Sequence, residues 1–155
     1  MADREHTYQV TVEWIGNKGE GTENYQAYDR LFKVAAGAKA DIAGSSDPAF
    51  LGDASRWNPE EMLLASASAC HKLWYLHLCA EAGISVQSYS DKAEGIMLEA
   101  TRGRFTRIIL KPQITLRAGD DIALATALHE KAHEQCFIAN SLDFPVFCEP
   151  HIIHA

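Results

Sequence analysis

The dominant hydrophobic pattern lies between Asn58 and Ile84, where apolar residues fall on every face of a predicted helix. Asn58 is a favourable N-cap, Pro59 suits the first helical turn, and Gly83 is a natural stop. These signals predict a helix of about 24 residues, roughly 36 Å long at ~1.5 Å per residue. Charged and polar residues near its centre leave no uncharged window of about 18 residues, so we expect a buried core helix and not a membrane span.

Before this helix, the chain carries the alternating pattern of strands. Tyr8–Trp14 alternates apolar and polar residues, which predicts a half-buried strand. Asn24–Val34 is predicted as a second strand, on which Arg30 shares a face with aromatic and apolar side chains. Lys39–Ala43 is predicted as a short third strand, and Gly44–Trp57 as irregular structure.

After the helix, strand patterns return. Ile84–Glu99 and Phe105–Leu116 are predicted strands, and Pro112 in the second indicates an edge position or the end of pairing. Asp120–Ile138 carries a one-sided apolar stripe that predicts a second helix. Phe144–Cys148 is predicted as a last short strand.

The order of these elements predicts an α+β fold with mostly antiparallel sheets around the long central helix. A length of 155 residues suits one domain, so we expect a single domain over residues 1–155. A helix that is apolar on every side needs cover on every side, and a second copy of the chain would supply it. We therefore expect a homodimer; the alternative is a monomer whose large sheet wraps around the helix.

The amino-acid composition limits which binding partners and which cellular compartment we expect. The chain has 14 basic and 21 acidic residues, a net charge of −7, which argues against nucleic acid or an anionic membrane as a partner. The first residues lack the apolar core of a signal peptide, and four cysteines are too few for a secreted disulfide scaffold. We therefore expect a cytoplasmic protein, in which a cysteine is either inert packing or a reactive group.

Cys70 and Cys136 are the first candidates for chemistry, because both lie in predicted helices and are far apart in sequence. A reactive cysteine needs a stabilised thiolate, and Arg30 or Arg56 could supply the positive charge. Glu60 could hold that arginine. However, Glu60 and Cys70 are roughly 15 Å apart along one helix, so they cannot both touch one arginine of the same chain. Either one of the three residues comes from a partner chain, or the arginine and Glu60 do not touch Cys70 directly. The alternative is that Cys70 is a small core residue.

Two other patterns in the sequence compete with this pair as candidates for chemistry. His129 to His133 matches H-E-x-x-H, and Cys136 follows on roughly the same face, a possible set of three zinc ligands. The alternative is an ordinary helix surface, on which such residues are common. Cys70 is followed by His71, as in some cysteine hydrolases, but adjacent helical residues do not face each other. The sequence therefore argues against acyl transfer.

Two segments resemble the OsmC/Ohr family, the osmotically inducible protein C and organic hydroperoxide resistance proteins. They are N-P-E-E-M-L-L-A-S-A-S-A-C-H, from Asn58 to His71, and A-H-E-Q-C-F-I-A-N-S, from Ala132 to Ser141. The most specific matches are N-P-E ten residues before Cys70 and the spacing A-H-x-x-C. The resemblance covers most of the chain in element order and points to an OsmC-like subgroup.

This resemblance implies a role for each candidate residue. Cys70 would be the peroxidatic cysteine and Cys136 the resolving cysteine. The family also uses an arginine held by the glutamate of the N-P-E motif, here Glu60, and we assign that role to Arg30. Members of the family form intertwined homodimers with sites at the interface, which agrees with the argument from the helix.

The implied reaction is a thiol-dependent peroxidase cycle without a cofactor. An organic hydroperoxide oxidises Cys70, a disulfide forms with Cys136, and a dithiol, in similar proteins a lipoylated protein or a small thiol, reduces it. The competing hypothesis is a non-enzymatic OsmC-like dimer that binds a small apolar ligand. In that case the cysteines are structural.

Overall fold

The computed structural model describes residues 2–155. The chain forms two compact units, a first that ends at Met62 and a second from Leu63 to Ala155. The expectation of one domain over residues 1–155 stays a prediction. None of the helices in the described residues is long and apolar enough to cross a membrane.

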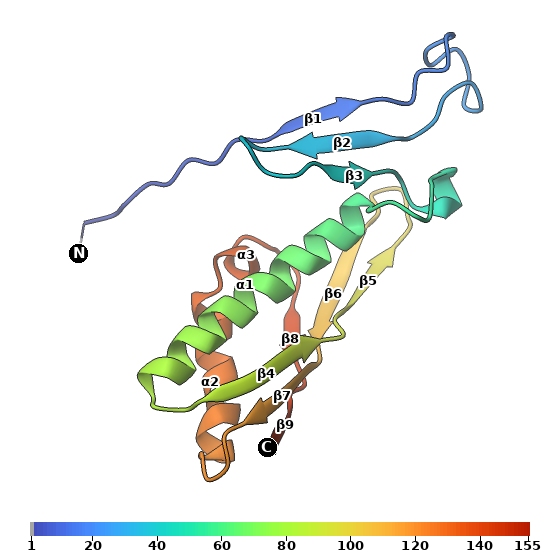
Figure 1. Ribbon diagram of the computed structural model, residues 1–155. Helices are drawn as coiled ribbons and strands as arrows, with labels where there is room; N and C mark the ends of the chain where they lie inside the picture. The colour runs from blue at the N-terminus through green and yellow to red at the C-terminus, as the bar shows by residue number, and fades with distance from the viewer. Residues whose placement is uncertain (1) are drawn as a thin grey trace. The chain divides into compact units, whose positions relative to one another are not determined.

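The first unit contains an antiparallel sheet of three strands in the order β1-β2-β3 (Figure 1). The strands are β1 (Thr11–Trp14), β2 (Phe32–Ala35) and β3 (Ile42–Gly44), and a short 3₁₀ helix, η1 (Pro48–Phe50), follows. The first and third predicted strands are therefore confirmed in a shorter or shifted form. The predicted half-burial of the first is not found within one chain, because Tyr8, Val10 and Val12 are 88%, 60% and 63% exposed.

The predicted strand over Asn24–Val34 is mostly wrong, because regular pairing begins only at Phe32. The segment before it forms turns. The Asn24 side chain accepts a hydrogen bond from the backbone N–H of Gln26, and the Trp14 indole donates to the carbonyl of Asp29. The bond between Asn24 and Gln26 is local and gives the backbone an alternative to strand pairing. Arg30 consequently lies in a loop and not on the face of a strand.

The long helix is confirmed as α1 (Pro59–Glu81), which begins in the first unit and continues through the second. The Asn58 side chain accepts a bond from the N–H of Glu61 at 2.8 Å and donates to the Glu61 carboxylate at 2.6 Å. This reciprocal pair caps the helix N-terminus. At the other end, Gly83 has a φ of +75°, the left-handed conformation that terminates helices and suits glycine.

Within one chain, α1 buries a single face. Its buried residues recur at helical spacing: Ala67, His71, Tyr75, Leu78 and Cys79. Leu73, on another face, is 63% exposed. The expectation that the helix is covered on every side is therefore not met by one copy of the chain.

Two sheets of three strands complete the second unit, in the orders β4-β7-β9 and β5-β6-β8 (Figure 1). The strands are β4 (Val86–Asp91), β5 (Glu94–Leu98), β6 (Arg104–Leu110), β7 (Pro112–Leu116), β8 (Val146–Cys148) and β9 (His151–His154). Pro112 starts a central strand, so the edge alternative is wrong and the end-of-pairing alternative is confirmed. Between the end of β6 and the start of β7, the backbone N–H of Lys111 donates to the Asp91 carboxylate at 2.7 Å. This bond takes the place of a bond to a strand backbone.

The second predicted helix is divided into α2 (Ile122–Gln135) and α3 (Phe137–Asn140). Cys136 stands between them with extended backbone angles, φ −69° and ψ 108°. Side chains from α1, β7 and α2, together with Ile84 from the loop after α1, form the main core: Tyr75, Leu78, Cys79, Ile84, Ile114, Leu116, Ala125 and Ala132. The α+β class is confirmed, although β8 and β9 pair in parallel with their neighbours.

Candidate functional site

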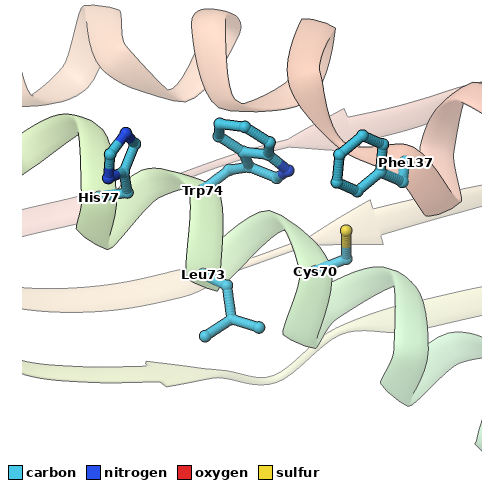
Figure 2. A pocket seen from close by; sticks show the side chains of 5 residues that line it. All are labelled: Cys70, Leu73, Trp74, His77 and Phe137. Carbon is cyan, nitrogen blue, oxygen red and sulfur yellow. The ribbon is translucent and has the colours of Figure 1, made fainter. Parts of the chain in front are cut away.

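Cys70 lines an apolar pocket of about 340 Å³ in the second unit (Figure 2). The other lining residues are Leu73, Trp74 and His77 of α1 and Phe137 of α3. The rings of Trp74 and Phe137 meet edge to face, with centroids 5.6 Å apart. The Cys70 thiol is half-buried, so a ligand that enters this pocket reaches the sulfur along an apolar wall.

Cys136 is buried next to Cys70, at the junction of α2 and α3. Its sulfur accepts the backbone N–H of Ala139 at 3.4 Å, as the N-cap of α3. Burial raises the pKa of the Cys136 thiol to about 11, and a hydrogen bond with the Cys70 thiol contributes in the same direction. Both thiols are free. The fold therefore brings together two cysteines that the sequence separates by 66 positions, while their roles stay predictions.

Arg30 is held within the first unit by its own loop. Its guanidinium donates to the carbonyls of Tyr28 and Tyr25, each at 2.6 Å, and lies over both tyrosine rings at 4.0 and 4.4 Å from their centroids. It also lines a pocket of about 260 Å³ together with Leu51. The expectation that Arg30 shares a strand face with apolar residues is wrong, because the segment is a loop; its assigned catalytic role stays a prediction.

Arg56 and Glu60 occupy structural positions at the start of α1. The Arg56 side chain donates to the carbonyls of Gly44 and Phe32, both at 2.9 Å, and so joins the ends of β2 and β3. Glu60 lies in the first turn of α1, where a carboxylate favours the helix dipole. Because α1 is uninterrupted, Glu60 and Cys70 remain about 15 Å apart along the helix. The pairing of Glu60 with an arginine stays a prediction.

The H-E-x-x-H segment does not assemble the possible zinc-ligand set of His129, His133 and Cys136. His129 is buried and faces His71 of α1, with 2.9 Å between His129 Nδ1 and His71 Nε2. The Cys148 sulfur lies 3.6 Å from the first of these atoms and 3.8 Å from the second. His133 is exposed, and Cys136 is next to Cys70. Sequence reasoning missed this cluster, because its members come from three elements and follow no local spacing.

Burial controls the protonation of this second cluster. Burial, followed by the charge of His133, lowers the pKa of His71 to about 4. Burial, followed by the charge of His71, lowers the pKa of His129 to about 3. Burial and then the nearby Asp91 carboxylate raise the pKa of the Cys148 thiol to about 12. At neutral pH all three groups are uncharged.

Comparison with known proteins identifies the family. A family profile described as OsmC-like protein matches residues 52–150. The uncharacterized protein YmaD of Bacillus subtilis (strain 168) is 28% identical over 148 residues, which cover 92% of this chain and 89% of that protein. Among solved structures, the OsmC-like protein of unknown function VCA0330 from Vibrio cholerae is 28% identical, with a TM-score of 0.86 over 95% of this chain and 100% of that one.

A further solved structure carries a functional description. It is an organic hydroperoxide resistance protein from Elizabethkingia anophelis, 19% identical, with a TM-score of 0.68 over 98% of this chain and 100% of that one. At this identity the likeness concerns the fold alone. The α+β fold of this chain therefore matches solved OsmC-like structures over nearly its full length.

Proposed function

Because this chain belongs to the OsmC-like protein family, we propose that it is a thiol-dependent peroxidase that reduces organic hydroperoxides with Cys70 and Cys136. One observation carries the proposal: the half-buried thiol of Cys70 opens onto an apolar pocket and lies close enough to the buried thiol of Cys136 to affect its pKa. A two-cysteine peroxidase needs this arrangement, because the oxidised sulfur must meet a second thiol before another oxidant reaches it.

The first step is attack of the Cys70 thiolate on the O–O bond of the hydroperoxide. The bond breaks, Cys70 becomes a sulfenic acid, and the alkoxide leaves and takes a proton as an alcohol. The second step is attack of the Cys136 thiolate on the sulfenic sulfur, which forms the Cys70–Cys136 disulfide and releases water. An external dithiol then reduces the disulfide by exchange and restores both thiols.

The pocket lining supports a preference for organic peroxides. Leu73, Trp74 and Phe137 offer an apolar surface that an alkyl or aryl group can cover and hydrogen peroxide cannot. A bulky alkyl hydroperoxide should therefore react with a higher kcat/KM than hydrogen peroxide. Equal kcat/KM values for the two would contradict this assignment of substrate class.

Two further parts of the proposal concern activation and assembly. We propose that Arg30, held by Glu60, stabilises the Cys70 thiolate in the working assembly, as the family resemblance implies. We also propose that this assembly is a homodimer, since one chain leaves apolar side chains of β1 and α1 exposed, among them Val12 and Leu73.

The direct test is turnover of cumene hydroperoxide with a dithiol reductant. The wild-type protein should consume peroxide, and Cys70→Ser should lose all activity. Cys79→Ser is the matched control, because Cys79 is a buried cysteine of the same helix outside the pocket. Loss of activity in Cys70→Ser with activity retained in Cys79→Ser supports the proposal. Peroxide consumption that is unchanged in Cys70→Ser would refute it.

A second candidate function follows from the same pocket. Its apolar lining would also suit a small apolar ligand, bound by a non-enzymatic protein whose cysteines are structural. In that case no peroxide turnover is found, all four thiols survive exposure to peroxide, and Trp74 fluorescence responds to an apolar ligand.

A further inference from the structure

The buried cluster of His71, His129 and Cys148 plays no part in the proposed peroxidase chemistry. The three residues lie on α1, on α2 and at the end of β8, at sequence separations of 58 and 19 positions. Their ligand-type atoms, two ring nitrogens and one sulfur, all lie within 4.8 Å of one another. Histidine nitrogens and a cysteine sulfur are the ligands that Zn²⁺ prefers in proteins.

Two of the three distances within the cluster match edges of a zinc tetrahedron. Zn–N bonds of ~2.05 Å and Zn–S bonds of ~2.3 Å at tetrahedral angles give nitrogen–sulfur edges of about 3.6 Å and a nitrogen–nitrogen edge of about 3.4 Å. The observed nitrogen–sulfur distances are 3.6 and 3.8 Å. The nitrogen–nitrogen distance is 2.9 Å, which a separation of about half an ångström would bring to the required value.

We propose that His71, His129 and Cys148 form a buried Zn²⁺ site that joins α1 and α2 to the end of β8. Three protein ligands leave one tetrahedral position for a water molecule. The site is independent of the Cys70–Cys136 pair, and so it stands or falls separately from the proposed peroxidase.

The surroundings of the cluster also suit a cation. The Asp91 carboxylate carries a negative charge near both His71 and Cys148. Its carboxylate is fixed by the Ser68 hydroxyl at 2.6 Å and by the N–H of Lys111 at 2.7 Å. A bound Zn²⁺ with one thiolate ligand has a net charge of +1, which this carboxylate would stabilise.

The ligand side chains are already oriented. The His129 ring stacks on Tyr75, with centroids 3.9 Å apart and planes within 8°. His71 Nε2 and His129 Nδ1 already face each other across one hydrogen bond, which metal coordination would replace. A cysteine binds Zn²⁺ as the thiolate, so binding should release the proton of the Cys148 thiol.

The test is metal binding by the full-length reduced protein. The wild type should bind one Zn²⁺ per chain, and its Co²⁺ form should show a thiolate-to-metal charge-transfer band in the near ultraviolet. Cys148→Ser should lose that band and bind at least about 100-fold more weakly, since losing even an outer partner of a ligand costs about 10–100-fold. Cys79→Ser is the matched control and should bind like the wild type, as should the double variant Cys70→Ser/Cys136→Ser.

A second measurement does not depend on whether these variants fold. Zn²⁺ should protect Cys148 of the wild-type protein from alkylation, as mapped by peptide mass spectrometry, and should leave Cys70 reactive. Absence of Zn²⁺ and Co²⁺ binding by the wild type would overturn the proposal. Protection of Cys70 and Cys136 instead, with binding lost in the double variant, would also overturn it.

Discussion

At the scale of single residues, Cys70 and Cys136 differ in exposure as a two-step reaction requires. Cys70 lines the pocket, whereas Cys136 has no exposed surface and a pKa raised to about 11 by burial. A neutral, inaccessible thiol does not compete for peroxide. In the proposed cycle Cys136 therefore reacts only with the oxidised sulfur of Cys70. Burial alone then explains why Cys70 is oxidised first and the disulfide forms second.

This difference predicts the pH dependence of disulfide formation. Because only the thiolate attacks, the rate of the second step should rise roughly tenfold per unit between pH 7 and 9, as it does for a thiol with a pKa near 11. The rate can be followed by the fluorescence of Trp74 after one equivalent of peroxide is mixed with the protein. Cys136→Ser should lose this phase and accumulate the sulfenic acid. A rate that is constant from pH 7 to 9 would contradict the assignment.

The buried histidines predict a loss of stability in mild acid for the metal-free protein. Burial lowers the pKa of His71 to about 4 and that of His129 to about 3, whereas both are ordinarily 6.5. The unfolded chain therefore binds more protons, and stability is complete above pH 6.5 and falls as pH decreases towards these values. Between pH 7 and 5 each histidine should cost roughly 2 kcal/mol of unfolding free energy.

Urea unfolding at pH 7 and pH 5 measures this effect. In His129→Phe, which keeps a ring against Tyr75, the loss of stability in acid should be smaller by roughly 2 kcal/mol than in the wild type. His77→Gln is the control, because His77 is an exposed histidine of the same helix. If His129→Phe loses as much unfolding free energy between pH 7 and pH 5 as the wild type, the lowered pKa of buried His129 is not the cause of the acid sensitivity.

At the scale of elements, helix ends were predictable and loop conformations were not. The signals at Asn58 and Gly83 are local, and the structure confirms both ends of α1 to within a few residues. The loop around Arg30 mimics a strand in its apolar pattern, but side-chain bonds to the backbone determine its conformation. The break at Cys136 within an otherwise helical pattern also carries no local signal.

The same limits apply to the candidate site. Cys70 and Cys136 were candidates from the residues themselves, but their roles followed from the family resemblance, because local patterns do not show which distant residues meet. The cluster of His71, His129 and Cys148 could not be predicted, since it depends on how α1, α2 and β8 pack. The H-E-x-x-H spacing offered His133 only as a possible partner of His129, and His129 instead faces His71.

The end of α1 gives a stability prediction. Gly83→Ala should cost about 1–2 kcal/mol, because alanine disfavours the left-handed conformation at φ +75°. The added methyl group meets nothing within 4 Å, so the cost comes from the backbone alone. Gly83→Asn, which tolerates this conformation better, should lose less. Urea unfolding measures both, and an alanine variant as stable as the wild type would contradict the assignment.

At the scale of the whole molecule, apolar side chains remain exposed in both units. Tyr8, Val10 and Val12 in the first unit and Leu73 and Phe137 in the second are each at least 60% exposed. In the proposed homodimer, these are surfaces that the second copy would cover. Leu73 lies on a face of α1 that one chain leaves uncovered, so the apolar residues on every side of this helix are not all buried within a single copy.

The assembly can be tested by light scattering coupled to size-exclusion chromatography. The wild-type protein should have twice the mass of the 17.1 kDa chain. Val10→Lys/Val12→Lys should dissociate it, because two charges would be buried without partners at the interface. Thr11→Lys is the matched control on the intervening position and should stay dimeric. A wild-type mass of one chain would contradict the proposed dimer.

The most direct test of the peroxidase is a count of thiols after one equivalent of cumene hydroperoxide, without reductant. The proposed cycle predicts the loss of two thiols of the four per chain, and peptide mapping should recover one disulfide between Cys70 and Cys136. Cys70→Ser should keep all three of its remaining thiols. Four intact thiols in the wild type, or a disulfide that involves Cys79 or Cys148 instead, would contradict the proposed function.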